Sequence, residues 1–334
     1  LDEATAAAEA MTMTHRLSKD RNTFLVSKDC HPQVIAVVET RAAPLGININ
    51  LNDHADFDFT EDVFGCLVQY PDTNGTIHNF RHLCTGAHEQ SAFVIMAADI
   101  MSLALLTPPG ELGADVTVGS SQRFGVPMGY GGPHAAYFAV TEQFKRHIPG
   151  RLIGVSVDCH GQPAYRMALQ TREQHIRRER ATSNICTAQV LLAIMSGMYA
   201  VYHGPLGIRR IAKQIHQHTC DLAASLTAAD HKIHNDSFFD TIRVTGPDNI
   251  VDKTRSSGFN IRDFSDGTVG ISLDETVTAS DLKNLLTLFD ADYSADADSV
   301  IPSELQRKSA YLTHPASNSF HSEPDTLRYI HRLE

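Results

Sequence analysis

The chain has 334 residues, of which 42% are hydrophobic and 20% are charged, and its formal net charge is −11. Such a chain can bury the cores of one large and one smaller domain. The acidic balance argues against general affinity for nucleic acid or anionic membranes. Six cysteines without CxxC spacing argue against a disulfide or zinc framework, so we expect reduced thiols.

Apolar, β-prone runs alternate with helical periodicity after an alanine-rich opening helix. The sequence predicts helices at 32–43 and 77–90, and strands at 23–27, 46–50, 64–70, 92–97, 116–119 and 135–140. This alternation is typical of a mostly parallel sheet with helices on both faces. We therefore predict an α/β domain whose chemistry lies in the loops at the strand ends.

A β-hairpin is predicted beyond this sheet. Strands at 152–157 and 163–169 flank Asp158–Gln162, where glycine and polar residues suit a turn, and we expect a surface arm. Helices are predicted at about 172–180, 185–203 and 206–228. The apolar stretch Ala188–Val201 is too short for a bilayer span, so we expect a buried helix and no membrane association.

The run Gly204-Pro205-Leu206-Gly207 breaks the helical periodicity and predicts a domain boundary. We predict a large α/β domain over residues 1–204, a small α+β domain over 205–290 and an irregular linker over 291–334. Within the small domain we expect a helix at 279–289 and strands near 240–245, 258–262 and 268–273.

No metal site is predicted. An EF-hand loop needs a glycine at its sixth position and a glutamate at its twelfth, and neither is in register with the acidic residues of the linker, Asp290, Asp292, Asp296 and Asp298. We interpret these four as solvated. His216 and His218 lie two residues apart on a predicted helix, so their side chains point to different faces.

A glycine-rich loop, Gly125–His134, follows the strand-like run Ala114–Val118 and the connecting residues Gly119–Phe124. Many enzymes of pyridoxal-phosphate (PLP) chemistry place their Schiff-base lysine after such a strand. Here no lysine occurs between Lys28 and Lys145. The loop also lacks GxGxxG spacing, which argues against a nicotinamide site. The sequence therefore indicates the scaffold of PLP chemistry without its nucleophile.

The order of motifs resembles the P-protein family of the glycine cleavage system, glycine dehydrogenase (decarboxylating), over essentially the whole chain. The residues that carry the resemblance are Asp2–Thr5, Cys30-His31-Pro32, Ala97-Ala98-Asp99, Gln122-Arg123-Phe124 and 172–187. It implies two similar halves, each with the aminotransferase-like fold of PLP fold type I, in one chain or in two subunits. Because the chain starts inside a helix without methionine, we expect a fragment of the amino-terminal half.

The resemblance places the cofactor lysine in the other half. Matching Phe124 and Pro127 puts that lysine at Gln122, whereas an ungapped count from the preceding strand puts it at Arg123. Neither side chain forms a Schiff base. We therefore expect no catalytic residue and no PLP in this chain, with the cofactor of the complete enzyme bound by the missing half.

Other cofactor positions are degenerate by the same comparison. The acidic residue that holds the pyridine nitrogen is approximated by Asp99, although a count back from Gly110 matches it to Met96. His31 matches the ring-stacking histidine, and we interpret it as a relic turn residue. The helix that would anchor the phosphate begins with Asp2 and Glu3, whose charges repel a phosphate dianion.

Aminotransferase-like folds build each active site at a dimer interface, so we expect a dimeric assembly. The candidates for facing the partner's active site are Gln122, Arg123 and His134; the alternative for them is a purely structural loop. A basic ridge, either a solvated helix face or a site for an acidic partner protein, is formed by Arg172, Arg177, Arg178 and Arg180. Cys186 is expected to be a buried thiol.

The reaction implied by the resemblance is decarboxylation of glycine on PLP, with transfer of the aminomethyl group to the lipoyl arm of H-protein. The partners implied are the carboxy-terminal half, lipoylated H-protein and glycine. A stand-alone aminotransferase is disfavoured by the missing lysine, and a non-catalytic assembly domain remains an alternative. We expect the isolated chain to be inactive, and its location to be the bacterial cytoplasm, or mitochondria in a eukaryote.

Overall fold

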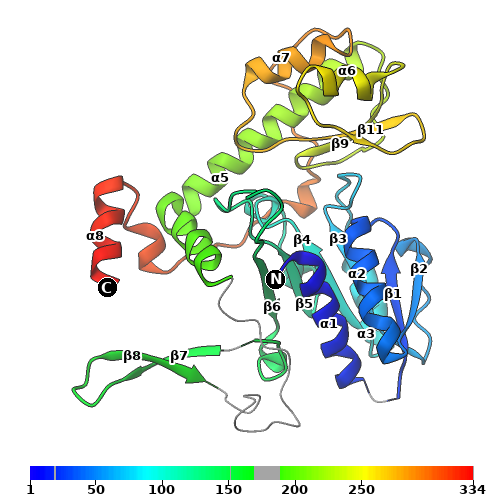
Figure 1. Ribbon diagram of the computed structural model, residues 1–334. Helices are drawn as coiled ribbons and strands as arrows, with labels where there is room; N and C mark the ends of the chain where they lie inside the picture. The colour runs from blue at the N-terminus through cyan, green and yellow to red at the C-terminus, as the bar shows by residue number, and fades with distance from the viewer. Residues whose placement is uncertain (19, 151, 169–188, 334) are drawn as a thin grey trace.

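The computed structural model describes residues 1–18, 20–150, 152–168 and 189–333. Its larger part is a six-stranded sheet in the order β2-β1-β3-β4-β5-β6 (Figure 1). The first five strands are parallel, and the edge strand β6 runs antiparallel to β5. The bounds are β1 Thr23–Ser27, β2 Asn48–Asn52, β3 Val63–Tyr70, β4 Phe93–Ala98, β5 Val116–Ser120 and β6 Ala136–Val140. The mostly parallel α/β sheet expected from the sequence is confirmed.

Alternating side chains of the central strands enter two separate cores. Phe64 and Leu67 of β3 pack with the helices α1 (Glu3–Leu17) and α2 (Pro32–Ala42). Cys66 and Val68 of the same strand face α3 (Arg81–Glu89) on the other side of the sheet. Every residue of β3 is buried, as expected of a strand covered on both faces.

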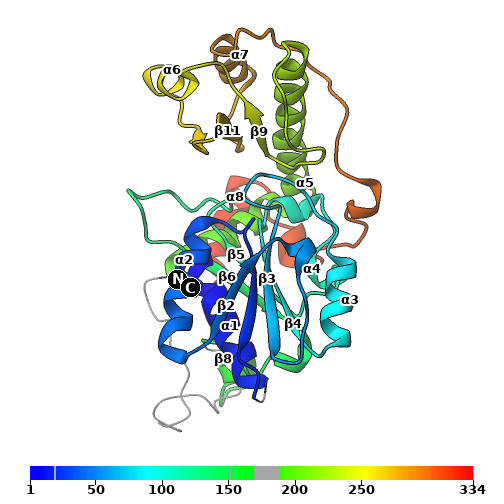
Figure 2. The same cartoon turned by 90° about the vertical axis from the view of Figure 1, so that its right-hand side faces the viewer.

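The smaller part contains an antiparallel sheet in the order β10-β11-β9, with bounds β9 Thr241–Thr245, β10 Arg262–Asp263 and β11 Thr268–Ser272. Two helices cover it, α6 (Ile250–Ser256) and α7 (Ala279–Thr287). Thr278 and Asp281 form a reciprocal capping box at the start of α7. Figure 2 shows this sheet standing beyond the end of the large one.

The helical segment α5 (Val190–Ala228) joins the two parts and consists of two helices that meet at a kink at Gly204 and Pro205. Gly204 has φ 60° and ψ −178°, and an added Cβ would lie 2.7 Å from the carbonyl oxygen of Ser317. Glycine is therefore required there, because other residues rarely adopt this conformation. By length and composition α5 contains a window apolar enough to cross a membrane, and only 17% of that window is buried.

The prediction that Ala188–Val201 forms a buried helix is wrong for its first described turn. Val190, Leu191 and Ile194 are 57%, 64% and 55% exposed. Sequence periodicity showed an apolar helix but not what covers it. Within the described residues, the large domain packs against the opposite side of this segment, through Leu192, Ser196 and Ala200.

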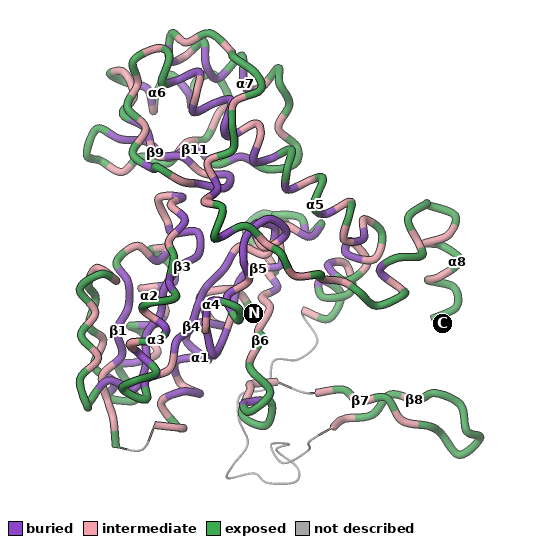
Figure 3. The backbone as a smooth tube through the Cα atoms, turned by 180° about the vertical axis from the view of Figure 1, so that it is seen from behind, coloured by how far each residue is buried: buried purple, intermediate pink, exposed green. Residues whose placement is uncertain are grey.

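The predicted hairpin arm is present as β7 (Leu152–Val157) and β8 (Pro163–Ala168), and it projects away from the sheet (Figure 3). One of its faces is apolar and open. Ile153, Val155, Val157 and Tyr165 are between 61% and 79% exposed.

The segment after α7 runs back along the molecule to the large domain. The N–H of Thr107 donates to the carbonyl of Leu305 at 2.7 Å, and the N–H of Arg307 donates to that of Leu105 at 2.6 Å. Ile301 and Leu305 are buried there. The four acidic residues named above are exposed, and the chain continues into the helix α8 (Glu323–Leu333).

Other boundaries moved where tertiary contacts intervene. The helix predicted at 77–90 begins at Arg81, because Thr76 and Ile77 instead pair with Phe238 and Ser237 of the small domain. The strand predicted at 258–262 is found instead as the two-residue β10, which overlaps it only at Arg262, and the helix α6 before it was not predicted. A further one-turn helix, α4, spans Pro109–Leu112.

Candidate functional site

A cavity of about 580 Å³ lies at the carboxyl ends of the parallel strands, between the two domains. The large domain lines it with Glu3 at the start of α1 and with loops that follow β3, β4 and β5. The small domain contributes Asp240, Thr241 and residues 272–276. Ligands of open α/β sheets bind at this edge, so the cavity is the candidate site.

Arg123 occupies the centre of the charge distribution. Its Nη1 forms ion pairs with Asp240 of the small domain and, at 3.3 Å, with Oδ2 of Asp99 just beyond β4. Burial acts to lower the pKa of Arg123, but Asp99 and Asp240 raise it overall. Burial raises the pKa of Asp99, whereas the positive charge of Arg123 lowers it. The guanidinium thus joins the two domains as a permanent cation.

The amino terminus of α1 points at this cluster. Asp2 caps the helix by accepting a 2.7 Å hydrogen bond from the N–H of Thr5, which directs Glu3 into the cavity. Gln69 Nε2 donates to Glu3 Oε1 at 3.4 Å. Burial of the carboxyl group raises the pKa of Glu3 to about 7. A helix end that offers a carboxylate is poorly suited to bind phosphate.

His31 lines the cavity from the loop after β1. Its Nδ1 lies 3.0 Å from the Oγ1 of Thr73, which accepts a 2.6 Å hydrogen bond from Arg262 of the small domain. Burial, reinforced by Arg262, lowers the pKa of His31. His31 therefore participates in the contact between the domains.

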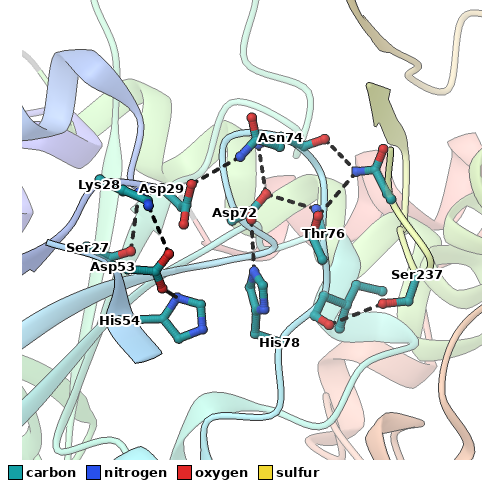
Figure 4. A network of polar contacts seen from close by, with 12 residues as sticks. Ser27, Lys28, Asp29, Asp53, His54, Asp72, Asn74, Thr76, His78 and Ser237 are labelled. Carbon is teal, nitrogen blue, oxygen red and sulfur yellow. Dashed lines mark hydrogen bonds and ion pairs between the residues drawn. The ribbon is translucent and has the colours of Figure 1, made fainter. Parts of the chain in front are cut away.

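A polar network beside the cavity ties the same loops together (Figure 4). Asp72 accepts hydrogen bonds from the N–H groups of Asn74 and Thr76 and lies 2.9 Å from His78 Nε2. Gly75 in this turn approaches the carbonyl of Thr241 so closely that an added Cβ would lie 2.1 Å away. Asp29, Asp53 and His54 lie close enough together to hold a metal ion, but the ammonium of Lys28 already lies 2.9 Å from Asp53.

The first residues of the glycine-rich loop, Gly125, Val126 and Met128, line the cavity. Gln122 lines the cavity beside Arg123, whereas His134 is not among its described lining residues. Met128 is 78% exposed and Tyr130 is fully exposed, whereas Val126 is buried near Leu192 of α5.

The structure thus brings together His31, Asp99, Gln122 and Arg123. Asp99 lies at the strand end, while Met96, favoured by the count along the sequence, is inside the core. Sequence reasoning missed Gln69, Asp240 and Glu275, because no local pattern relates them to the loop after β5. Arg172, Arg177, Arg178, Arg180 and Cys186 lie outside the described residues. The five described cysteines are free thiols.

The cavity does not fit PLP. Among its described lining residues none is a lysine, so no Schiff base forms with a side chain there. Asp99, at the strand end where a pyridine nitrogen would be held, is instead paired with Arg123. Glu3 takes the helix end where a phosphate would sit.

Residues 1–289 match the family model for the glycine cleavage system P-protein. The chain belongs to this family. Glycine dehydrogenase (decarboxylating) of Nostoc punctiforme is 54% identical over the whole chain, and the mitochondrial form of Dictyostelium discoideum is 50% identical. In both, the chain spans 36% of the relative's length.

Solved structures agree with this family and fold. The crystal structure of an inhibitor-bound glycine decarboxylase (P-protein) is similar with a TM-score of 0.79 and 30% identity, over 86% of this chain and 69% of that one. A cysteine desulfurase from Thermococcus onnurineus shares only the fold, with a TM-score of 0.57 and 14% identity over 86% of this chain and 77% of that one. The fold is aminotransferase-like, PLP fold type I.

Proposed function

We propose that this chain is the part of glycine dehydrogenase (decarboxylating) that does not carry the cofactor lysine. The assembled enzyme decarboxylates glycine on PLP held by its other half and transfers the aminomethyl group to the lipoyl arm of H-protein. This chain shapes the active site without supplying its nucleophile. By itself it binds no PLP and is inactive.

The observation that carries this proposal is the pairing of Arg123 with Asp99 and Asp240 in the cavity where the fold places its cofactor. A guanidinium stays protonated and does not form a Schiff base. Because it neutralises Asp99 from within the chain, the cavity keeps its shape without a pyridine ring. The ion pair between Arg123 and Asp240 also holds the small domain against the large one.

Assembly with the other half is supported by apolar surface that this chain leaves open. The hairpin face of Ile153, Val155, Val157 and Tyr165 is exposed, and so is the start of α5 (Figure 3). A two-stranded hairpin is marginal in water unless its apolar face packs on something. We propose that these faces, with the loop of Met128 and Tyr130, pack on the cofactor-bearing half in a dimeric arrangement.

Gln122, Arg123 and His134 are proposed to face the active site of that half. The four arginines of the sequence run 172–180, Arg172, Arg177, Arg178 and Arg180, are proposed to contact H-protein, because concentrated positive charge suits an acidic partner. The relatives come from cyanobacteria and from a eukaryote whose form is mitochondrial. We propose the bacterial cytoplasm for this chain.

A non-catalytic assembly domain is the second candidate, and the same exposed apolar faces favour it. The two proposals differ in whether the chain is required for turnover. A lysine-bearing carboxy-terminal polypeptide is assayed for glycine decarboxylation with and without the purified chain. We expect PLP absorbance in the carboxy-terminal polypeptide alone and turnover only in the mixture.

Two other outcomes of this assay would count against the first proposal. Turnover by the carboxy-terminal polypeptide alone supports the assembly domain. A reducible aldimine band in this chain, abolished by mutating one of its lysines, overturns the proposal that it binds no PLP.

A further inference from the structure

The cavity has more acceptors than donors. Its described lining residues contribute six carboxyl groups, from Glu3, Asp72, Asp99, Asp240, Asp274 and Glu275, against the single guanidinium of Arg123. Most of these groups have partners within the chain. Asp72 and Asp274 accept bonds from backbone N–H groups, Glu275 accepts one from the hydroxyl of Tyr199, and Asp240 is paired with Arg123.

Two buried oxygen atoms near Glu3, Gln69 Oε1 and Asp99 Oδ2, have no hydrogen-bond donor among the described residues. Gln69 is 3% exposed, and its Oε1 accepts no hydrogen bond from the described residues, because its Nε2 is the group directed at Glu3. Asp99 Oδ2 also lacks a hydrogen bond from them, although it is 3.3 Å from Arg123. A buried acceptor without a donor is costly, and a water molecule or a ligand that donates a hydrogen bond would relieve this cost.

The geometry points to a binding site for a small protonated primary amine, whose ammonium donates to Gln69 Oε1 and to the carboxylate of Glu3. An ammonium carries three donors and no acceptor, which matches the deficit. An anionic ligand does not match it, because Arg123 is already held by two carboxylates. This site is independent of the proposed function, since it needs neither the cofactor nor the other half.

A proton competes with the amine for this site. Burial is the main reason why the pKa of Glu3 is raised to about 7; the charges of Asp99 and Asp2 raise it further, and hydrogen bonds from Gln69 and the N–H of Ser120 lower it. Cys30 and Tyr137 also face Glu3, and burial raises the pKa of both, so they stay neutral near pH 7. When Glu3 is protonated, its hydroxyl can donate to Gln69 in place of the ligand. Amine affinity is therefore expected to rise by about tenfold per pH unit below pH 7 and to level off above it.

The test is calorimetric titration of the 334-residue chain with n-propylammonium chloride, after a cooperative thermal transition shows that the chain is folded. We expect saturable binding at one site, with proton release near neutral pH, measured in two buffers of different ionisation enthalpy. Glu3→Gln and Gln69→Leu should each weaken binding by about tenfold or more. Asp252→Asn, which removes an exposed carboxylate on α6, should leave the affinity unchanged.

Tetramethylammonium and potassium chloride are the matched control ligands, because both are cations without N–H donors. The proposal is overturned if either control ligand binds as tightly as n-propylammonium, or if both site variants keep the wild-type affinity. It is also overturned if no saturable heat is seen at about pH 6 and none at about pH 8. Glu3→Gln is nearly isosteric and removes the titrating group, so loss of proton release in this variant also tests the assignment to Glu3.

Discussion

Nη1 of Arg123 lies 3.3 Å from Oδ2 of Asp99, and the same nitrogen pairs with Asp240 of the other domain. One cation therefore serves two carboxylates that come from separate domains. The three side chains are between 11% and 24% exposed. Water therefore weakens the attraction between their charges less than it does for ion pairs on the surface. Removing the cation would leave two like charges close together.

We predict that Arg123→Gln lowers the free energy of unfolding by about 2 kcal/mol or more, because both carboxylates lose their partner. Urea unfolding measures this. Arg255→Gln is the matched control, since Arg255 is 72% exposed and its pair with Asp252 lies on one helix. The control should change stability by less than about 0.5 kcal/mol. If both substitutions changed the free energy of unfolding equally, the ion pairs of Arg123 would not be what holds the domains together.

A second prediction concerns turnover in the enzyme assembled from both halves. Arg123→Ala and His134→Ala should each lower kcat for glycine about tenfold or more, the size expected from losing a charge-assisted hydrogen bond near the reaction. A loop that is only structural would leave kcat per folded site normal, even where the melting temperature falls. Measuring kcat, KM and melting temperature together distinguishes the two results.

The hairpin face gives a third prediction. Val155→Asp should weaken association with the carboxy-terminal half by about tenfold or more, because an unpaired charge would be buried in an apolar interface. Val155 is 77% exposed in this chain, so its folding should not change. Ser156→Asp places the same charge on the opposite face of the strand and should have little effect. Sedimentation velocity of mixtures with the carboxy-terminal half measures the association. Equal association of the Val155→Asp and Ser156→Asp variants would contradict the prediction.

The kink of α5 gives a fourth prediction. Gly204→Ala should destabilise the chain by about 2 to 4 kcal/mol, because the residue has a positive φ and its Cβ would overlap Ser317 and His321. Gly197→Ala should instead stabilise it by about 0.5 to 1 kcal/mol, since that glycine lies within the same helix and its Cβ would meet no atom within 4 Å. Thermal unfolding of the two variants should therefore shift in opposite directions.

The titration of Glu3 gives a fifth prediction. Its pKa is about 7 in the folded chain against 4.5 for an ordinary glutamate, so the folded state binds the proton more tightly. The contribution of Glu3 to stability is thus present below about pH 4.5 and is lost as pH rises to about 7. We expect a loss of about 3 kcal/mol over this range in the wild-type chain, and a smaller one in Glu3→Gln. Parallel pH profiles would contradict the assignment.

The sequence by itself determined the alternation of strands and helices in the large domain and the absence of lysine between Lys28 and Lys145. The strand Thr23–Ser27 and the hairpin strand Leu152–Val157 were predicted with the bounds that the structure has. Local periodicity is sufficient here, because side-chain alternation within a few residues decides which face is buried. The lack of lysine around the loop after β5 is likewise readable from the sequence alone.

Only the tertiary structure decided which charged groups meet and which apolar faces stay open. Arg123 and Asp240 are 117 residues apart, and nothing in either local sequence predicts their pairing. The start of α5 has the composition of a buried helix but is exposed along one side, because burial depends on what packs against a helix. Contacts between distant segments therefore placed Arg123 in ion pairs that join the two domains.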